Sequence, residues 1–312
     1  MLGAVPGMRI LAIIILLMFP ALAQDSFLER DKDANGRLTL NESGLSPEIF
    51  ESLDKSKNGE LSLGEFGEHW IKISSPPFLK DAKYGGHPRH KLDLYLPTER
   101  TSEMPLVLWI HGGSWKSGDK ANCPFSSLTK NGVAVASLNY RYTPDAPFPA
   151  QKQDCEEALK WLKQQEELLG CRFKGVTAIG LSAGGHISLV LAQGGVVDRA
   201  VAFGSPSDLT PAAAQEGYTE TLELLVGGPL EENQQALRQA SPLYLEVAEG
   251  SRFYLAHGTA DRRVPYQQSL ALAKRLAGIG RFVDLTLIPD GSHTVVGGPL
   301  MFEKIRRAVS QP

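Results

Sequence analysis

The chain has 312 residues, of which 42% are apolar and 21% charged, a composition that is ordinary for a globular protein with a large core. Its formal charge of −3 is spread along the chain, and no basic run offers a face for phosphates. Composition and charge therefore argue against a nucleic-acid-binding protein.

The first 23 residues are typical of an export signal. Arg9 precedes the apolar run "ILAIIILLMF", which is followed by Pro20 and the small residues "ALA". A charged start, a short apolar core and a small-residue site predict a signal peptide that is cleaved after Ala23. The alternative is an uncleaved membrane anchor, but the run is shorter than the ~20 residues that span a bilayer. We therefore expect a secreted or periplasmic protein with no stable membrane span after cleavage.

Two similar acidic segments follow, "DKDANGRLTLNE" (31–42) and "DKSKNGELSLGE" (54–65). The first matches the pattern D-x-[DN]-x-[DN]-G-x5-E at every position. In such loops alternate residues supply oxygen ligands to Ca²⁺, a glycine allows the sharp turn, and a final glutamate closes the site. Both segments resemble the loops of the EF-hand family, which implies a small α-helical, EF-hand-like module over residues 24–73 that holds structural Ca²⁺. The candidate ligands are Asp31, Asp33, Asn35, Arg37 (backbone carbonyl) and Glu42 in the first loop, and Asp54, Ser56, Asn58, Glu60 (backbone carbonyl) and Glu65 in the second.

The two loops differ in charge and in what precedes them. Ser56 replaces an acid, so we expect the second loop to bind Ca²⁺ more weakly. Only seven residues (24–30) precede the first loop after signal cleavage, too few for a full entering helix. This favours a loop followed by a helix, as in dockerin-like calcium repeats. Leu38 and Leu61 share one loop position, where paired loops pack together. A pair of acidic turns that have lost their ion is the alternative interpretation.

A helix is expected at 46–54, leading into the second loop, and the stretch "SSPPF" predicts a linker over 74–79. From residue 80 to 312, short apolar runs alternate with helical patterns. Such alternation predicts an α/β domain, with a mostly parallel sheet between helices and ligand chemistry at the carboxyl ends of the strands. Residues 211–245 interrupt the series and predict a small helical lid. The expected strands are 91–97, 105–111, 132–140, 174–180, 198–204, 251–258 and 282–289, and the expected helices are 152–169, 186–193, 265–280 and 300–309.

The three cysteines do not form a recognisable framework. Cys123, Cys155 and Cys171 are odd in number, irregular in spacing, and include no C-x-x-C pair. We expect at least two of them to be buried, small apolar side chains, and we expect neither a disulfide framework nor a zinc site held by cysteines.

A serine stands between the strand expected at 174–180 and the helix that follows. Gly180-Leu181-Ser182-Ala183-Gly184 is a G-x-S-x-G sequence, and a turn tight enough to expose the serine hydroxyl needs glycines on both sides. The following helix directs its free N–H groups at the serine. The alternative is an ordinary polar residue in a glycine-rich turn.

Three further motifs follow expected strands: "HGGSW" (111–115), "HGTADRRVP" with Asp261, and "IPDGSHT" with His293. The order Ser182, Asp261, His293 is that of an α/β-hydrolase triad. With "LDLYLP" and "LNYRY", these motifs resemble the α/β-hydrolase fold over about residues 78–311. Within that fold they resemble the secreted carboxylesterases that include feruloyl and acetyl-xylan esterase-like members, related to the hormone-sensitive lipase group.

The resemblance implies a role for each residue. Ser182 is the expected nucleophile, His293 the general base and acid, and Asp261 the orienting acid, with no organic cofactor. The expected oxyanion donors are the backbone N–H groups of Gly113, Ser114 and Ala183. Ser114 stands where the family usually has a third glycine. Asp208 and Asp290 are rivals for the acid, and we interpret His111, His186 and His257 as structural residues.

These motifs predict a serine carboxylic ester hydrolase that acts on short-acyl or plant-polysaccharide-linked esters. Two alternatives stay open. The same scaffold carries peptidases and amide hydrolases, although we find no acidic motif to hold a substrate amine. A non-catalytic, calcium-dependent binding protein is the other, and the intact triad argues against it.

Overall fold

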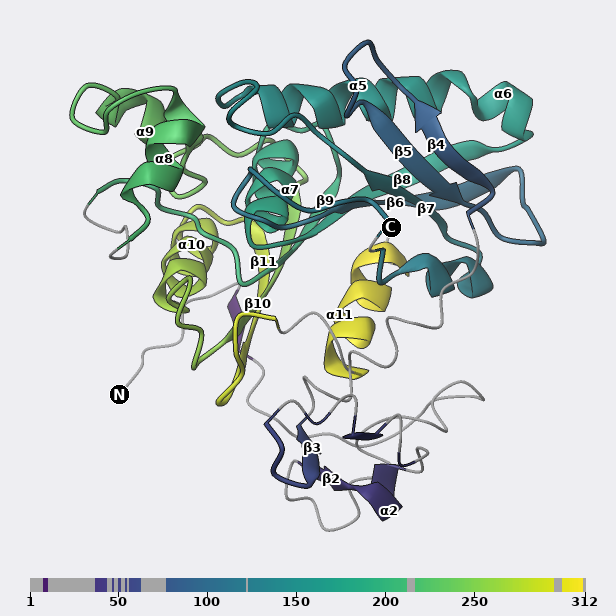
Figure 1. Cartoon of the computed structure of the whole chain (residues 1–312). Helices are drawn as coiled ribbons and strands as arrows, with labels where there is room; N and C mark the ends of the chain where they lie inside the picture. The colour runs from purple at the N-terminus through teal and green to yellow at the C-terminus, as the bar shows by residue number, and fades with distance from the viewer. Residues whose placement is uncertain are drawn as a thin grey trace.

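The computed structural model describes residues 8–10, 37–43, 47, 50–51, 54, 56–62, 77–121, 123–211, 217–294 and 299–310. A nine-stranded sheet forms its centre (Figure 1). The strands are β1 (Met8–Ile10), β4 (Leu79–Lys83), β5 (Lys91–Tyr95), β6 (Glu103–Ile110), β7 (Ala134–Leu138), β8 (Arg172–Leu181), β9 (Arg199–Phe203), β10 (Arg252–Gly258) and β11 (Phe282–Ile288). Their order across the sheet is β1-β11-β10-β9-β8-β6-β7-β5-β4.

Every neighbouring pair from β7 to β1 is parallel, and β5 and β4 add an antiparallel edge. All seven strands expected in this domain are present, including β5 as an antiparallel strand. The sequence did not predict β4, because a polar, half-exposed edge strand carries no apolar alternation. Nor did it predict β1, which pairs with β11 and lies in the segment that we expect to be a signal peptide.

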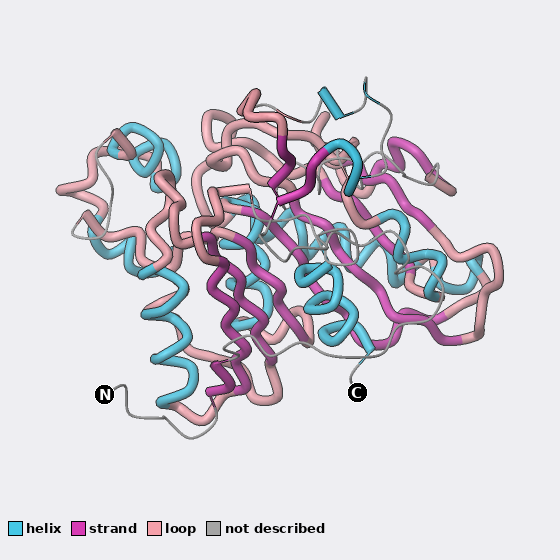
Figure 2. Tube along the Cα trace, turned by 90° about the horizontal axis from the view of Figure 1, so that it is seen from below, coloured by secondary structure: helices cyan, strands magenta, loops and turns pink. Residues whose placement is uncertain are grey.

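Helices follow most of the strands. They are α5 (Ala150–Gln164), α6 (Glu166–Leu169), α7 (Ala183–Gln193), α8 (Thr219–Val226), α9 (Gln234–Ala240), α10 (Gln267–Gly278) and α11 (Pro299–Ser310), with a 3₁₀ helix, η2, at Ser126–Asn131. The expected helix 152–169 is divided into α5 and α6 at Gln165. Helices α8 and α9 lie in the expected lid segment and form a lobe beside α10 (Figures 1 and 2).

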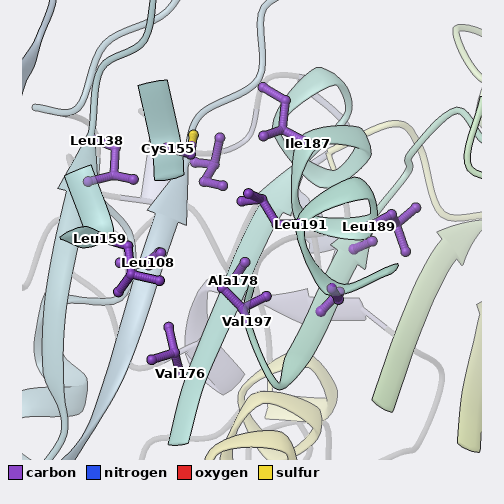
Figure 3. Close-up of a cluster of buried hydrophobic side chains, with 14 of the residues drawn as sticks. Leu108, Leu138, Cys155, Leu159, Val176, Ala178, Ile187, Leu189, Leu191 and Val197 are labelled. Carbon is purple, nitrogen blue, oxygen red and sulfur yellow. The ribbon is translucent and has the colours of Figure 1, made fainter. Parts of the chain in front are cut away.

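The core lies on both faces of the sheet because successive strand residues point to opposite sides. On one face, side chains of β6 and β8 pack under α5 and α7, as Figure 3 shows for Leu108, Ala178, Cys155, Leu159, Ile187 and Leu191. On the other face, Val107 and Trp109 of β6 pack with residues of η2 and α11. The sheet is thus covered on both sides, as its continuous apolar strands predict.

A separate two-stranded sheet belongs to the N-terminal segment. Its strands β2 (Arg37–Thr39) and β3 (Glu60–Ser62) are antiparallel, and the short helix α2 (Leu40–Ser43) follows β2. Leu38 and Leu61 are register partners and are both fully buried. This is the packing expected from their shared loop position. The helix expected at 46–54 falls largely outside the described residues.

The three cysteines are buried and unpaired, as expected. Within the ranges that the structure describes, no helix combines the length and the apolar character needed to cross a membrane.

Candidate active site

Ser182 lies between the end of β8 and the first turn of α7, in a strained backbone conformation with φ 56° and ψ −120°. A side chain on Gly180 would overlap the backbone of Gly184, and one on Gly184 would overlap the carbonyl oxygen of Ile110. Strand, turn and helix are therefore in direct backbone contact. Only glycines on both sides of the serine allow this turn.

The loop after β6 lies beside this serine. A side chain on Gly112 would come within 3.5 Å of Ser182 Cβ. The next three residues, Gly113, Ser114 and Trp115, all have positive φ, at 115°, 51° and 57°. None of the hydrogen bonds among the described residues uses the N–H of Gly113, Ser114 or Ala183 as its donor. The predicted oxyanion donors thus come from two segments that meet at Ser182.

Buried aromatic side chains support the same loop. The ring of His111 stacks on Tyr140 at 4.5 Å, and its Nδ1 donates to the carbonyl oxygen of Gly112 at 2.8 Å. Tyr140 in turn donates its hydroxyl to the His111 carbonyl at 2.9 Å. Burial lowers the pKa of His111 to about 4, so its ring is neutral at neutral pH. His111 therefore supports the loop, as the sequence analysis expected.

Asp261 follows β10 and His293 follows β11. His293 Nδ1 donates to Asp261 Oδ2 at 2.7 Å, while Oδ1 accepts the backbone N–H groups of Arg263 (2.8 Å) and Val264 (3.0 Å). Burial alone would raise the pKa of Asp261, but hydrogen bonds from His257, from His293 and from these amides hold it well below its usual range. The carboxylate is ionised and oriented toward His293.

The two rival carboxylates have other partners. Asp208 accepts the Tyr244 hydroxyl at 2.9 Å and the Thr210 hydroxyl at 2.7 Å. Asp290 is exposed, and its backbone N–H donates to Thr259. Neither carboxylate bonds to His293 in the described hydrogen bonds, so only Asp261 is placed to orient that histidine.

The end of β9 brings the three predicted residues together. Ser182 donates its backbone N–H to the Phe203 carbonyl at 2.8 Å. A side chain on the next residue, Gly204, would lie 3.3 Å from Asp261 Oδ2 and 3.4 Å from His293 Nδ1. The end of β9 therefore lies beside the backbone of Ser182 and beside the Asp261–His293 pair. Among the described hydrogen bonds, none joins the side chains of Ser182 and His293.

Sequence reasoning missed two contacts of this site. His257 Nε2 lies 3.2 Å from Asp261 Oδ2, in direct contact with the carboxylate. Arg89 stacks over Tyr142 at 3.6 Å and donates to the Tyr140 carbonyl at 2.8 Å, next to the oxyanion loop. The only sequence signal for His257 is its position at a strand end four residues before Asp261, and Arg89 has none.

The candidate calcium ligands are described in part. Asp31, Asp33, Asn35 and Glu65 lie outside the described residues. Asp54 accepts the Ser56 hydroxyl at 3.1 Å and the N–H groups of Asn58 (3.2 Å) and Gly59 (2.8 Å), so the second loop is wrapped around this carboxylate. Burial raises the pKa of Asp54, and hydrogen bonds, first from Gly59 and then from Asn58 and Ser56, lower it by more.

The remaining described ligands have partners within the module. In the first loop, the Glu42 carboxylate accepts the Thr39 hydroxyl at 2.8 Å, and Arg37 pairs with Glu60 at 3.7 Å. The ionised Asp54 and the oxygen-rich donor set suit a hard cation such as Ca²⁺. In the described part of the chain, no group of three or more His, Cys, Asp or Glu side chains is arranged to hold a metal ion.

Comparison with known proteins gives one family model and several relatives that are named as esterases. The BD-FAE family model matches residues 92–276. A probable isoprenylcysteine alpha-carbonyl methylesterase (ICMEL1) of Oryza sativa subsp. japonica is 26% identical over 245 residues, which cover 70% of this chain and 58% of that protein. Esterase LipC of Mycobacterium tuberculosis is 25% identical over 67% of this chain and 58% of its own length. The chain thus spans little more than half the length of these curated relatives.

Solved structures share the fold. A truncated carbohydrate esterase from gut microbiota has a TM-score of 0.68 at 22% identity and covers 75% of this chain and 96% of its own. An acetyl ester-xyloside bifunctional hydrolase from Caldicellulosiruptor lactoaceticus has a TM-score of 0.60 at 19% identity, over 75% and 92% of the two chains. This likeness agrees with the α/β-hydrolase fold expected from the sequence.

Proposed function

The chain belongs to the BD-FAE family, and from this premise we propose that it is a serine carboxylic ester hydrolase whose triad is Ser182, Asp261 and His293. The observation that carries the proposal is the 2.7 Å bond between His293 and Asp261 beside the strained turn of Ser182. Relatives named as esterases support the reaction class.

The mechanism follows from these positions. His293 takes the proton of the Ser182 hydroxyl, and the serine oxygen attacks the ester carbonyl. Backbone N–H groups of Gly113, Ser114 and Ala183 stabilise the oxyanion, and loss of one such donor typically slows a reaction by about 10²–10³-fold. His293 then gives its proton to the leaving alcohol. Water, activated by His293 in the same way, hydrolyses the acyl-enzyme and returns the free serine and a carboxylic acid.

We propose short-acyl or carbohydrate-linked esters as the substrate class. Support comes from structural neighbours described as a carbohydrate esterase and an acetyl ester-xyloside hydrolase. In the two short helices α8 and α9, Leu222, Leu225 and Leu237 are buried, and no large apolar side chain of these helices is exposed to receive a long acyl chain.

Two further expectations remain proposals for the whole chain. The charged start, apolar run and "ALA" of the first 23 residues support export to the periplasm or the medium. The acidic repeats, the Asp54 turn and the pairing of Leu38 with Leu61 support a Ca²⁺-binding module with a structural role.

The test is hydrolysis of nitrophenyl acetate and longer acyl esters by the wild type and by Ser182→Ala. We expect hydrolysis that favours short acyl chains and falls by at least about 10³-fold in the variant. Ser251→Ala is a matched control, because Ser251 is also buried but donates to Ala192 O, away from the triad. Full activity in a folded Ser182→Ala protein would contradict the proposed nucleophile.

Two further assays test the alternative functions. Nitroanilide substrates test for a peptidase or amide hydrolase, and calcium-dependent pull-down on polysaccharide tests for a binding protein. Ser182-dependent cleavage of an anilide without ester hydrolysis would favour the peptidase. Binding without any turnover in the folded wild type would favour the calcium-dependent binding protein.

A further inference from the structure

A second histidine faces the carboxylate of Asp261. His257, the penultimate residue of β10, is fully buried, and its Nε2 lies 3.2 Å from Asp261 Oδ2. The same oxygen accepts the Nδ1 proton of His293 at 2.7 Å. One oxygen of the carboxylate is therefore shared by two imidazole rings.

The partners of His257 determine where its proton lies. Nε2 faces two acceptors, Asp261 Oδ2 and the Val264 carbonyl oxygen at 2.8 Å, so this nitrogen carries a hydrogen. Nδ1 lies 2.7 Å from the hydroxyl of Ser269, a buried residue of α10. Ser269 thus orients the ring of His257 with Nε2 toward the carboxylate.

These contacts form a continuous chain from α10 through Ser269, His257 and Asp261 to His293. We propose that His257 is a positioning residue for ester hydrolysis, which holds Asp261 against His293 and offsets part of the negative charge on Oδ2. This inference rests on the proposed function, because His293 must be the base whose strength is adjusted.

The effect has a definite direction. The side chain of Asp261 is fully buried, so charges around it are poorly screened. A donor at Oδ2 weakens the attraction of the carboxylate for a protonated His293. Removing that donor therefore strengthens the attraction and favours the imidazolium form of His293 over the neutral base.

Other charged or titratable groups lie near Asp261. Tyr218, directly before α8, interacts electrostatically with Asp261 and with Arg263, whose backbone N–H donates to the Asp261 carboxylate. Burial raises the pKa of Tyr218, while Arg263 lowers it and Asp261 raises it. Both groups are present in the wild type and in every variant below, so a shift between those proteins reports on His257.

The experiment measures kcat and KM for nitrophenyl acetate between about pH 5 and 9, a range that spans the titration of a catalytic histidine. The variants are His257→Leu, which removes the donor, His257→Gln, which retains an amide donor, and Ser269→Ala, which releases the ring. Ser251→Ala removes a comparable buried hydroxyl that donates to Ala192 O, and serves as the control. Circular dichroism and thermal melting establish that each variant is folded.

We expect kcat of His257→Leu to fall about 10- to 100-fold, by analogy with the loss of residues that orient metal ligands. KM should stay within about twofold, because the proposed role of His257 is carried entirely by its contact with Asp261. The acid limb of kcat/KM should move to higher pH in His257→Leu and, by less, in Ser269→Ala. His257→Gln retains an amide donor, so its kcat and the position of its acid limb should lie between those of His257→Leu and the wild type.

An acid limb that is unmoved, or moved to lower pH, in folded His257→Leu would overturn the inference and leave His257 a structural residue. The pH dependence of Ser182 acylation by a sulfonyl fluoride gives a second readout that needs no turnover, and it should shift in the same direction. Failure of the proposed function has a different signature, namely no Ser182-dependent hydrolysis in the wild type itself. That result would overturn both proposals.

Discussion

Ser182 is held in a left-handed backbone conformation by contacts that its own side chain does not make. Residues in such sparsely populated conformations cost about 1–3 kcal/mol and persist only where their surroundings enforce them. Here the surroundings are the backbones of Gly180, Gly184 and Ile110, which meet without side chains between them.

Replacing Gly184 with alanine should therefore damage both stability and activity. The added Cβ would overlap the carbonyl oxygens of Ile110 and His111, and a backbone cannot move aside as a side chain can. We expect a loss of about 1–3 kcal/mol in the free energy of unfolding. Displacement of Ser182 by about 1 Å should lower kcat/KM by about 10²-fold.

Gly278→Ala is the matched control for this substitution. Gly278 ends helix α10, and a Cβ there would meet nothing within 4 Å. We expect unchanged activity and a free energy of unfolding that is equal or higher by up to about 1 kcal/mol. Equal effects of the two substitutions, measured by urea unfolding and ester hydrolysis, would refute the steric account of the turn.

At the scale of the elements, one histidine joins three parts of the active-site rim. His186 of α7 accepts the indole N–H of Trp115 at Nδ1 (3.2 Å) and donates from Nε2 to the carbonyl oxygen of Ala240 (2.7 Å). Trp115 belongs to the loop after β6, and Ala240 is the last residue of α9. Helix α7, this loop and α9 therefore share one buried, neutral imidazole.

This arrangement predicts a loss of stability in mild acid. Burial lowers the pKa of His186 to about 4, whereas an unperturbed histidine titrates near 6.5. As the pH falls below about 6.5, the His186 ring is protonated in the unfolded chain but stays neutral in the folded chain. The free energy of unfolding should therefore decrease between about pH 6.5 and 4, by up to a few kcal/mol. His111, whose pKa is also about 4, contributes in the same pH range.

Urea unfolding at pH 7 and pH 5 provides the test. His186→Gln replaces the ring with a side chain that does not titrate, so it should be less stable than wild type at pH 7 but lose less stability on acidification. An equal loss in the two proteins would show that His186 does not carry this pH dependence.

At the scale of the whole molecule, the two sheets differ in how they are stabilised. The large sheet is covered on both faces by helices, whereas β2 and β3 bury few large apolar residues, of which Leu38 and Leu61 face each other. Among the described residues before Pro77, the buried apolar side chains are those of Leu38, Phe50 and Leu61. Small modules are often stabilised by a bound metal or by disulfides. This fits the structural role that we propose for Ca²⁺.

Calcium should therefore act on stability more than on turnover. At a concentration 100 times its dissociation constant, a ligand raises the free energy of unfolding of the unit that it binds by about 3 kcal/mol. We expect EDTA to lower the melting temperature of the module, and Asp54→Asn to reduce this difference. Calorimetry with parallel ester assays measures both effects. An immediate loss of turnover on chelation, in protein that stays folded, would contradict the structural role.

Features that depend on short stretches of chain could be predicted from the residues alone. Strands β6 and β7 follow from continuous apolar runs, and the turn at Ser182 follows from local sterics that require Gly180 and Gly184. The register of Leu38 with Leu61 could also be predicted, because two copies of one loop motif place equivalent residues at equivalent positions.

Contacts between residues that are far apart in the sequence could not be predicted and are seen only in the folded chain. Asp208, Asp261 and Asp290 all follow strands, and only the fold shows that Asp261 meets His293, 32 residues away. His257 was interpreted as structural because a strand-end histidine has no local signature of the partner that it contacts. The polar edge strand β4 was missed for a related reason, since its pairing with β5 is made by backbone groups that every residue carries. Periodicity and local sterics depend on neighbouring residues and can be predicted from them. The contacts of Asp261 with His293 and His257, and the pairing of β4 with β5, arise from packing that brings distant residues together.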